Sequence, residues 1–136
     1  MPGYINIDNR PETEPDKCLD ILEGLPYADN SVDEVRAHDI LEHIPIGKTV
    51  AVIEDIYRVL RPGGTFESLT PSTDGRGAFQ DPTHCSFWNK NSWLYYTHDA
   101  YISLYGTKAK FAGTVEDHVT DEENKVIHTL ARLIKC

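Results

Sequence analysis

The sequence predicts an α/β fold, in which helices pack against a mostly parallel β-sheet, and three observations lead to this class. In the first half of the chain, short apolar segments typical of strands lead into one clear helical segment. That segment spans about residues 48–61 and is followed by the helix stop Pro62-Gly63-Gly64. Near the C-terminus, strand segments at 111–119 and 125–134 flank the polar turn 120–124, as in a hairpin. We therefore expect a three-layer α/β sandwich whose mostly parallel sheet ends in a C-terminal antiparallel hairpin.

Length and composition limit the domain organisation and the class of partner. The chain has 136 residues and no repeat or Pro/Gly/Ser-rich linker, so we expect a single domain over residues 1–136. Thirteen Lys and Arg residues against 22 Asp and Glu residues give a formal net charge of −9. This charge disfavours a nucleic-acid partner, because binding to phosphate backbones requires clustered positive charge.

Cysteine usage and hydropathy give the expected compartment. Cys18, Cys85 and Cys136 form no C-x-x-C pair, which is typical of a reducing environment. No apolar run approaches the roughly 18 residues of a membrane span, and the first residues lack the basic and apolar regions of a secretory signal. We expect a cytoplasmic protein without a membrane partner.

The remaining elements follow from local patterns. Four more strands are expected, at 4–8, 18–22, 32–37 and 65–69. A second helix is expected to begin with Asn91 or Ser92 as its N-cap. Residues 70–80 are small and polar, which predicts an exposed loop.

Two aspartates stand at or near the ends of expected strands. Asp8 ends the first strand, where a carboxylate can accept hydrogen bonds from the two hydroxyls of a ribose. Asp20, in the second strand segment, could accept from an adenine amino group. Each aspartate has an alternative interpretation: Asp8 could initiate a turn, and Asp20 could be an ordinary surface residue.

A dense polar cluster, H-D-I-L-E-H, follows the third strand. It contains His38, Asp39, Glu42 and His43. Asp39 and His43 would share one face of a helix, so a metal site is one interpretation. The spacing differs from H-E-x-x-H, however, and the interleaved apolar residues indicate packing. We therefore favour a role in capping and in lining an active site, and we expect no metal.

A second polar candidate is the turn Asp81-Pro82-Thr83-His84. Its Asp, Thr and His side chains could orient a substrate or move a proton. Alternatively, Asp81 initiates a turn and His84 packs on the neighbouring aromatic residues. The large apolar residues that follow the turn could form the wall of a pocket, which favours the functional interpretation.

Several of these segments together resemble class I S-adenosylmethionine-dependent methyltransferases. The likeness extends over nearly the whole chain in the family's order. It is carried by Tyr4-Ile5-Asn6-Ile7-Asp8, by Leu25-Pro26-Tyr27-Ala28-Asp29-Asn30-Ser31-Val32-Asp33-Glu34-Val35, by His38 to His43, by Tyr57-Arg58-Val59-Leu60-Arg61-Pro62-Gly63-Gly64 and by Asp81-Pro82-Thr83-His84.

The resemblance implies the family's Rossmann-like three-layer sandwich, truncated at its N-terminus. It also implies a cofactor, S-adenosylmethionine, and a set of site residues. Asp8 matches the acid that binds the cofactor ribose, and Asp20 with the backbone of Ile21 matches the adenine contact. His38 and Asp39 match the segment that lines the cofactor and methyl-transfer site. His38, together with the aspartate and histidine of the D-P-T-H turn, could act as the base that takes a proton from the acceptor.

The sequence departs from the family pattern at its start. The family opens with a strand and a glycine-rich loop, and of these Gly3 is the only possible remnant. The missing strand would lie in the middle of the family sheet, between the strand ending at Asp8 and the strand ending near Ala37. We expect these two strands to pair directly, to borrow a strand from another subunit, or to belong to a longer protein. An open sheet edge would also favour a homodimer.

Three functions remain open at this stage. The first is a methyltransferase that acts on a small molecule or another acceptor. The second is a cofactor-free binding or assembly module with the same fold. The third is a metal-dependent hydrolase that uses the polar side chains of the two clusters, namely His38, Asp39, His43, Asp81 and His84.

Overall fold

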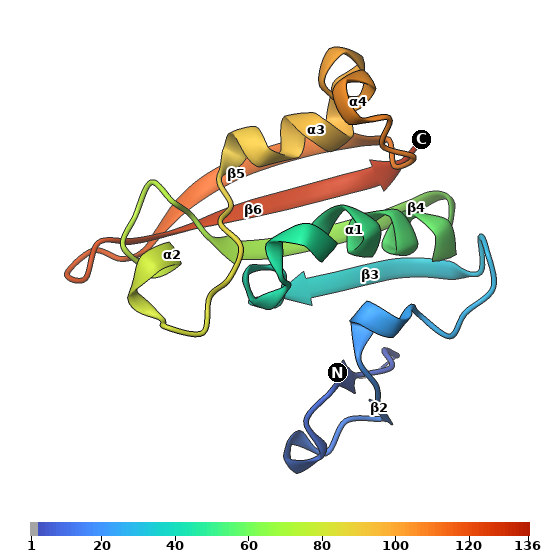
Figure 1. Cartoon of the computed structure of the whole chain (residues 1–136), viewed down its shortest axis with the longest axis horizontal. Coiled ribbons are helices and arrows are strands. Elements are labelled where there is room, and N and C mark those ends of the chain that lie inside the picture. Colours follow the sequence, from blue (N-terminus) through green and yellow to red (C-terminus); the bar gives the residue numbers. More distant parts are fainter. Residues whose placement is uncertain (1–2) are drawn as a thin grey trace.

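The computed structural model of the chain describes residues 3–136 and contains two β-sheets (Figure 1). The strands are β1 (Ile7–Asp8), β2 (Lys17–Cys18), β3 (Val32–His38), β4 (Leu60–Pro71), β5 (Phe111–Asp121) and β6 (Val126–Lys135). The α-helices are α1 (Thr49–Val59), α2 (Gly77–Gln80), α3 (Leu94–Thr97) and α4 (Asp99–Tyr105). Short 3-10 turns occur at Pro11–Thr13, Ile21–Glu23, Leu41–His43, Ile46–Lys48 and Lys90–Trp93.

The main sheet has the strand order β3-β4-β6-β5. Strands β3 and β4 are parallel, whereas β4–β6 and β5–β6 are antiparallel. Strands β1 and β2 form a separate parallel pair. The α/β class and the C-terminal hairpin are therefore confirmed, but the main sheet is mixed rather than mostly parallel. The reason is that β6 inserts beside β4, so that the hairpin contributes two antiparallel pairs to the sheet.

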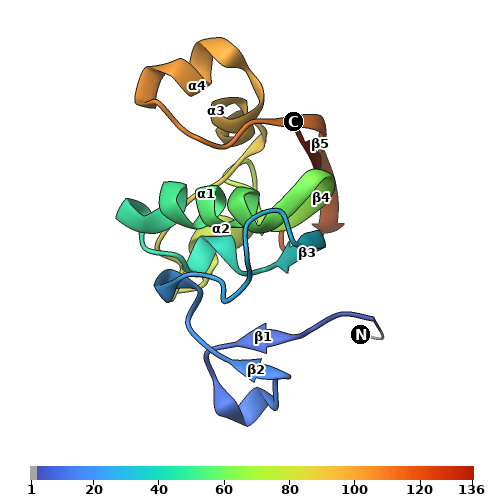
Figure 2. The same ribbon diagram turned by 90° about the vertical axis from the view of Figure 1, so that its right-hand side faces the viewer.

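Helices α1, α3 and α4 cover one face of the main sheet (Figure 2). On β4, residues Phe66, Ser68 and Thr70 are fully buried beneath these helices, whereas Glu67 between them faces the other way. The opposite face is polar: Glu67 accepts a hydrogen bond from Arg132 of β6. The expected third layer is therefore not found within residues 3–136.

The hydrophobic core lies between α1, the α3 region and the sheet. Apolar residues on one face of α1 are buried with the spacing that predicted the helix: Val52, Ile53, Ile56 and Val59. Across the core, the ring of Phe66 contacts Trp93 and Phe111, with centroids 5.9 Å apart in both pairs. These contacts hold the second helical region against the central strand.

Several predicted boundaries change in the structure. The helix expected at 48–61 ends at Val59, because Leu60 already begins β4, and β4 extends well beyond the strand expected at 65–69. The segment 70–80 is not simply an exposed loop, since Thr70 is buried in β4 and α2 forms at its end. The strand expected at 18–22 is reduced to β2.

The second helical segment begins earlier than predicted and is broken. Asn89, rather than Asn91 or Ser92, caps the 3-10 turn that leads into α3, and its side chain accepts from the backbone N–H of Asn91. Helix α3 then ends at Thr97, and the extended backbone of His98 separates it from α4. The expected strand at 4–8 is likewise reduced, to β1.

Strands β1 and β3 are not hydrogen-bonded to each other, so direct pairing, one of the three expected arrangements, is not found among the described residues. Instead, a side-chain contact bridges the N-terminal segment and β3. The Tyr4 hydroxyl donates to a carboxylate oxygen of Glu34, and the guanidinium of Arg36 lies over the Tyr4 ring, 4.8 Å from its centroid. This contact fixes the small sheet beside the edge of the main sheet without extending it.

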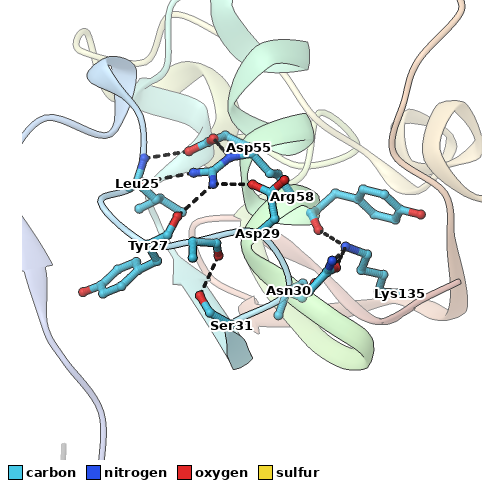
Figure 3. A network of polar contacts seen from close by, with 11 residues as sticks. Leu25, Tyr27, Asp29, Asn30, Ser31, Asp55, Arg58 and Lys135 are labelled. Carbon is cyan, nitrogen blue, oxygen red and sulfur yellow. Dashed lines mark hydrogen bonds and ion pairs between the residues drawn. The ribbon is translucent and has the colours of Figure 1, made fainter.

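Arg58 on α1 holds the loop that leads into β3 (Figure 3). Its guanidinium donates to Asp55 at 2.8 Å and to the carbonyl oxygens of Tyr27 and Leu25 at 2.8 and 3.0 Å. It also donates to Asp29 at 2.9 Å, and Asp55 in turn accepts from the backbone N–H of Leu25 at 2.6 Å. One side chain therefore satisfies two backbone carbonyls that no regular element pairs.

We expect Arg58→Ala to lower the free energy of unfolding by about 2 kcal/mol, because carbonyls and a carboxylate lose charged donors at a half-buried site. The matched control is Arg61→Ala, since Arg61 makes an exposed ion pair with Asp33. Removing that pair should cost less than about 0.5 kcal/mol. Urea unfolding of both variants measures the difference, and equal losses would contradict the role of Arg58.

Candidate functional site

A cavity of about 240 Å³ lies where β3 and β4 end. It is the place where α/β sheets generally bind ligands, because loops diverge beyond the carboxyl ends of parallel strands. Three separate parts of the chain meet there: the segment after β3, the segment from α2 to the D-P-T-H turn, and β6. The lining residues are Asp39, Glu42, His43, Pro71, Gly77, Gln80, Asp81, Val126, His84 and His128.

Asp39 begins the first of these segments. It has a left-handed backbone with φ of 55°, and its N–H donates to the carbonyl of Leu69 at 2.9 Å. This hydrogen bond extends the pairing of β3 with β4 by one residue beyond His38, and the pairing ends there. The carboxylate of Asp39 lies 3.3 Å from Nε2 of His128 on β6, which ties the mouth of the cavity to the hairpin.

Glu42 is the buried acid of the cavity. Only 2% of this residue is exposed, and its Oε2 has no hydrogen-bond partner among the described residues. Burial raises the pKa of its carboxyl group to about 7. Its backbone carbonyl accepts from the N–H groups of Cys85 and Ser86 at 2.9 and 3.1 Å, which fixes the D-P-T-H turn beside it.

The D-P-T-H turn presents Asp81 and His84 to the cavity. One carboxylate oxygen of Asp81 accepts from the N–H and the hydroxyl of Thr83, at 2.8 and 2.7 Å, and these bonds lower the Asp81 pKa. Its other oxygen lies 3.6 Å from Nε2 of His84. His84 is almost buried, and its Nδ1 bonds to the carbonyl of Ala78 at 3.0 Å. The turn interpretation therefore describes Asp81, whereas the ring that His84 contacts is that of His43.

His38 lies apart from this cavity. It ends β3 in register with Leu69, and its side chain lies on the same sheet face as Glu67. Its Nε2 lies 2.7 Å from Oε1 of Glu67. Burial raises the pKa of Glu67, but the hydrogen bonds from His38 and Arg132 outweigh burial and lower it overall. The structure thus separates His38 from Asp39, although the two are adjacent in sequence.

The predicted adenosine-binding residues also lie outside the cavity, on the N-terminal segment. Asp8 accepts from the backbone N–H of Arg10 at 2.9 Å and forms a two-pronged ion pair with its guanidinium, at 3.2 and 3.1 Å. Asp20 caps the following 3-10 turn by accepting from the N–H of Leu22 at 2.9 Å. Ile21 is partly buried against the core.

Of the cavity residues, His128 was not predicted from the sequence. It belongs to β6, more than 40 residues after the D-P-T-H turn, and it reaches the cavity through the pairing of β6 with β4. The residues next to His128 in the sequence follow an ordinary strand pattern, so they do not indicate that its side chain lines a cavity. Glu42 and His43 were recognised as part of a cluster, but their burial and mutual geometry depend on the fold.

A larger cavity, of about 360 Å³, lies between the loop after β4 and the hairpin turn. Its charged lining residues are Asp74, Arg76, Glu122 and Lys125. No histidine is among the described residues that line this space. We therefore place the candidate site at the smaller cavity, where titratable side chains converge.

Comparisons with known proteins agree with this fold. Residues 7–67 match the family model described as a methyltransferase domain. No curated protein matches the sequence. An S-adenosylmethionine-dependent methyltransferase from Archaeoglobus fulgidus has a similar structure, with 12% sequence identity, a TM-score of 0.67, and coverage of 93% of this chain and 74% of that protein.

Two further structures show the range of proteins with this fold. The N-methyltransferase NodS from Bradyrhizobium japonicum, in complex with S-adenosylhomocysteine, is 13% identical with a TM-score of 0.63, over 95% of this chain and 64% of NodS. The [4+2]-cyclase SpnF is 18% identical with a TM-score of 0.62, over 88% of this chain and 54% of SpnF. The chain thus spans about half to three quarters of the length of these proteins.

The chain therefore has the Rossmann-like fold of class I S-adenosylmethionine-dependent methyltransferases, as the sequence resemblance predicted. Within it, residues 7–67 carry the sequence pattern of the methyltransferase domain family. The fold alone does not fix the reaction, because one fold supports several chemistries. Among residues 3–136, no helix is long and apolar enough to cross a bilayer.

Proposed function

We propose that residues 1–136 form one methyltransferase domain, which transfers the methyl group of S-adenosylmethionine to a small molecule or another acceptor. The observation that supports this most directly is the family match over residues 7–67, which includes Asp8, Asp20 and the H-D-I-L-E-H segment in the family's order. The alternatives, a cofactor-free module and a metal-dependent hydrolase, have no comparable support.

We assign cofactor binding to Asp8, Asp20, Ile21, His38 and Asp39. The hydrogen bonds and positive charge of Arg10 lower the pKa of Asp8, so its carboxylate is anionic at neutral pH. An anionic carboxylate can accept hydrogen bonds from two ribose hydroxyls. Asp20 together with the backbone of Ile21 would contact the adenine ring and its amino group, as the family resemblance implies.

In the proposed reaction, S-adenosylmethionine would supply the methyl group of its sulfonium to the acceptor atom, and S-adenosylhomocysteine would leave with the electron pair of the broken S–C bond. The chain's own part is to position the acceptor and to take its proton. Of the three proposed catalytic residues, Asp81 and His84 line the cavity and could take that proton directly. His38 is held by Glu67 on the other face, so its contribution would require the side chain to turn.

The open edges of β1 and β3 support a strand-donating partner or a homodimer. Among the described residues, β1 pairs only with β2, and β3 pairs only with β4. Each strand therefore presents a row of unpaired N–H and C=O groups to a neighbouring strand. We propose that a strand from a second copy or from another polypeptide segment occupies this place and completes the cofactor site.

Calorimetric titration with S-adenosylhomocysteine tests the cofactor assignment. We expect saturable binding by the wild-type protein, and at least tenfold weaker binding by Asp8→Asn, since a tenfold loss corresponds to about 1.4 kcal/mol. Light scattering on the same samples reports whether binding accompanies self-association. Absence of heat at millimolar ligand would contradict cofactor binding by this chain alone.

The control for this titration is Asp33→Asn. Asp33 is also an aspartate paired with an arginine, but its side chain is 85% exposed and lies outside the proposed site. This variant should bind S-adenosylhomocysteine as the wild type does. If both variants lose affinity equally, the effect comes from net charge rather than from the Asp8 carboxylate.

A further inference from the structure

Three side chains of the cavity offer metal-ligating atoms close to one another. One ligand atom each from Glu42, His43 and His84 lie within 4.8 Å of one another. Nε2 of His43 lies 4.0 Å from Oε1 of Glu42. The His43 and His84 rings meet edge to face, with centroids 4.9 Å apart.

The hydrogen bonds around the two histidines engage Nδ1 of each ring and leave Nε2 as the ligand atom, with Nε2 of His84 lying 3.6 Å from a carboxylate oxygen of Asp81. Nδ1 of His84 lies 3.0 Å from the carbonyl of Ala78, which can only accept, so Nδ1 carries the proton. The hydroxyl proton of Thr83 is donated to Asp81. That hydroxyl can therefore only accept from Nδ1 of His43, 3.3 Å away. In each neutral ring, Nε2 then has its lone pair available.

Such second contacts are typical of metal-binding histidines. A ligating imidazole commonly donates its other N–H to a carbonyl, hydroxyl or carboxylate, which fixes both tautomer and ring orientation. Here Thr83 of the D-P-T-H turn supplies this contact to His43, and the carbonyl of Ala78 in α2 supplies it to His84. The turn that carries His84 is itself fixed by the carbonyl of Glu42.

The buried carboxyl group of Glu42 is the independent observation that points to a ligand. A polar oxygen without a partner costs free energy when it is buried. Oε2 of Glu42 is in this position among residues 3–136, as are side-chain atoms of Tyr27, Ser68, Thr70 and Trp93, but Glu42 is the carboxyl group of this set and the member that lines the cavity. A cation bound to the carboxylate would remove this cost.

We propose that Glu42, His43 and His84 bind a divalent transition-metal cation, best matched by Zn²⁺. Two imidazoles and one carboxylate form a known ligand set for zinc, whereas Mg²⁺ and Ca²⁺ prefer oxygen ligands only. Ligands at about 2.1 Å from one ion lie about 3.4 Å apart in tetrahedral geometry. The atoms must therefore approach by about 1 Å, which the 41% exposed side chain of His43 permits.

The remaining coordination position would face the cavity. A cation there would take an oxygen or nitrogen atom of a bound molecule, and the nearby Asp39 and Asp81 carboxylates add to its attraction. His84 would then hold the cation, and Asp81 would remain as the proton acceptor. The metal site does not depend on the binding of S-adenosylmethionine and can be tested without it.

The test is titration of chelator-treated protein with Zn²⁺ alone, followed by calorimetry and by thermal unfolding. We expect one ion per chain and an increase in the melting temperature. Glu42→Gln, which keeps the buried volume, and His43→Ala, at an exposed position, should each weaken binding at least tenfold. Mg²⁺ at the same concentration should give no shift.

The control variant is His118→Ala, because His118 is exposed on β5 and pairs only with Glu116. It should bind Zn²⁺ as the wild type does. The three exposed cysteines could also attract zinc, so the Co²⁺ derivative should be examined for thiolate charge-transfer bands. No binding, unchanged binding by Glu42→Gln and His43→Ala, or strong thiolate bands would each overturn the proposal.

Discussion

Replacing Phe66 by alanine should lower the free energy of unfolding by about 3–5 kcal/mol, the range for removing a fully buried aromatic ring. Phe66 is 0% exposed on the central strand β4, with neighbouring strands on both sides. Its ring contacts Trp93 and Phe111, which come from the 3-10 turn before α3 and from β5. The cavity would therefore open at the point where three elements meet, and it cannot collapse without moving the sheet. Urea unfolding, monitored by tryptophan fluorescence, measures the loss.

The control is Phe79→Ala. Phe79 is 62% exposed on α2 and stacks on Phe87, with ring centroids 5.2 Å apart. An exposed aromatic pair of this kind contributes about 0.5–1.5 kcal/mol. If Phe66→Ala loses no more stability than this control, Phe66 does not have the central position that the structure gives it.

The parts of the fold that the sequence predicted best depend on local patterns. The core face of α1 could be predicted because Val52, Ile53 and Ile56 recur at helical spacing. The hairpin of β5 and β6 could be predicted because a polar turn separates two strand-like segments. The second helical region was harder to predict, because the extended backbone at His98 interrupts it without a proline or glycine there.

The sheet order could not be derived from local patterns. Strand β6 inserts between β4 and β5, so the last strand in sequence is internal in the sheet. This order makes the sheet mixed and brings His128 to the cavity. Only the resemblance to a known family carried information about strand order, since periodicity describes each strand separately.

The candidate site shows the same limit at the level of single residues. His38 and Asp39 are adjacent in sequence, but His38 pairs with Glu67 on one face and Asp39 with His128 at the cavity. Successive strand residues face opposite sides, so a shift of one residue decides which of them lines a site. The local geometry around Glu42 could not be predicted either. The spacing of Asp39 and His43 assumes an α-helix, whereas the structure has a short 3-10 turn there, which places side chains differently.

Replacing Gly113 by alanine should have an effect of similar size to the loss of Phe66, at about 3 kcal/mol or more, because backbone strain and a steric clash add. Gly113 lies in β5 opposite Leu133, with a φ of 151° that L-residues rarely adopt. A Cβ atom there would lie 2.1 Å from the carbonyl oxygen of Arg132 and 3.0 Å from Cα of Leu133. Both neighbours are backbone atoms of β6, which is also hydrogen-bonded to β4, so β6 cannot move away without disturbing the centre of the sheet.

The matched control is Gly47→Ala, in the 3-10 turn before α1. A Cβ atom at Gly47 would meet no atom within 4 Å, so the substitution should change stability by less than about 0.5 kcal/mol. Unfolding by urea compares the two variants, and hydrogen exchange of the β5–β6 amides locates the damage. We expect Gly113→Ala to lose protection first along β5, because this strand is paired on one side only. Equal stability of the two alanine variants would show that β5 does not approach β6 as closely as the structure has it.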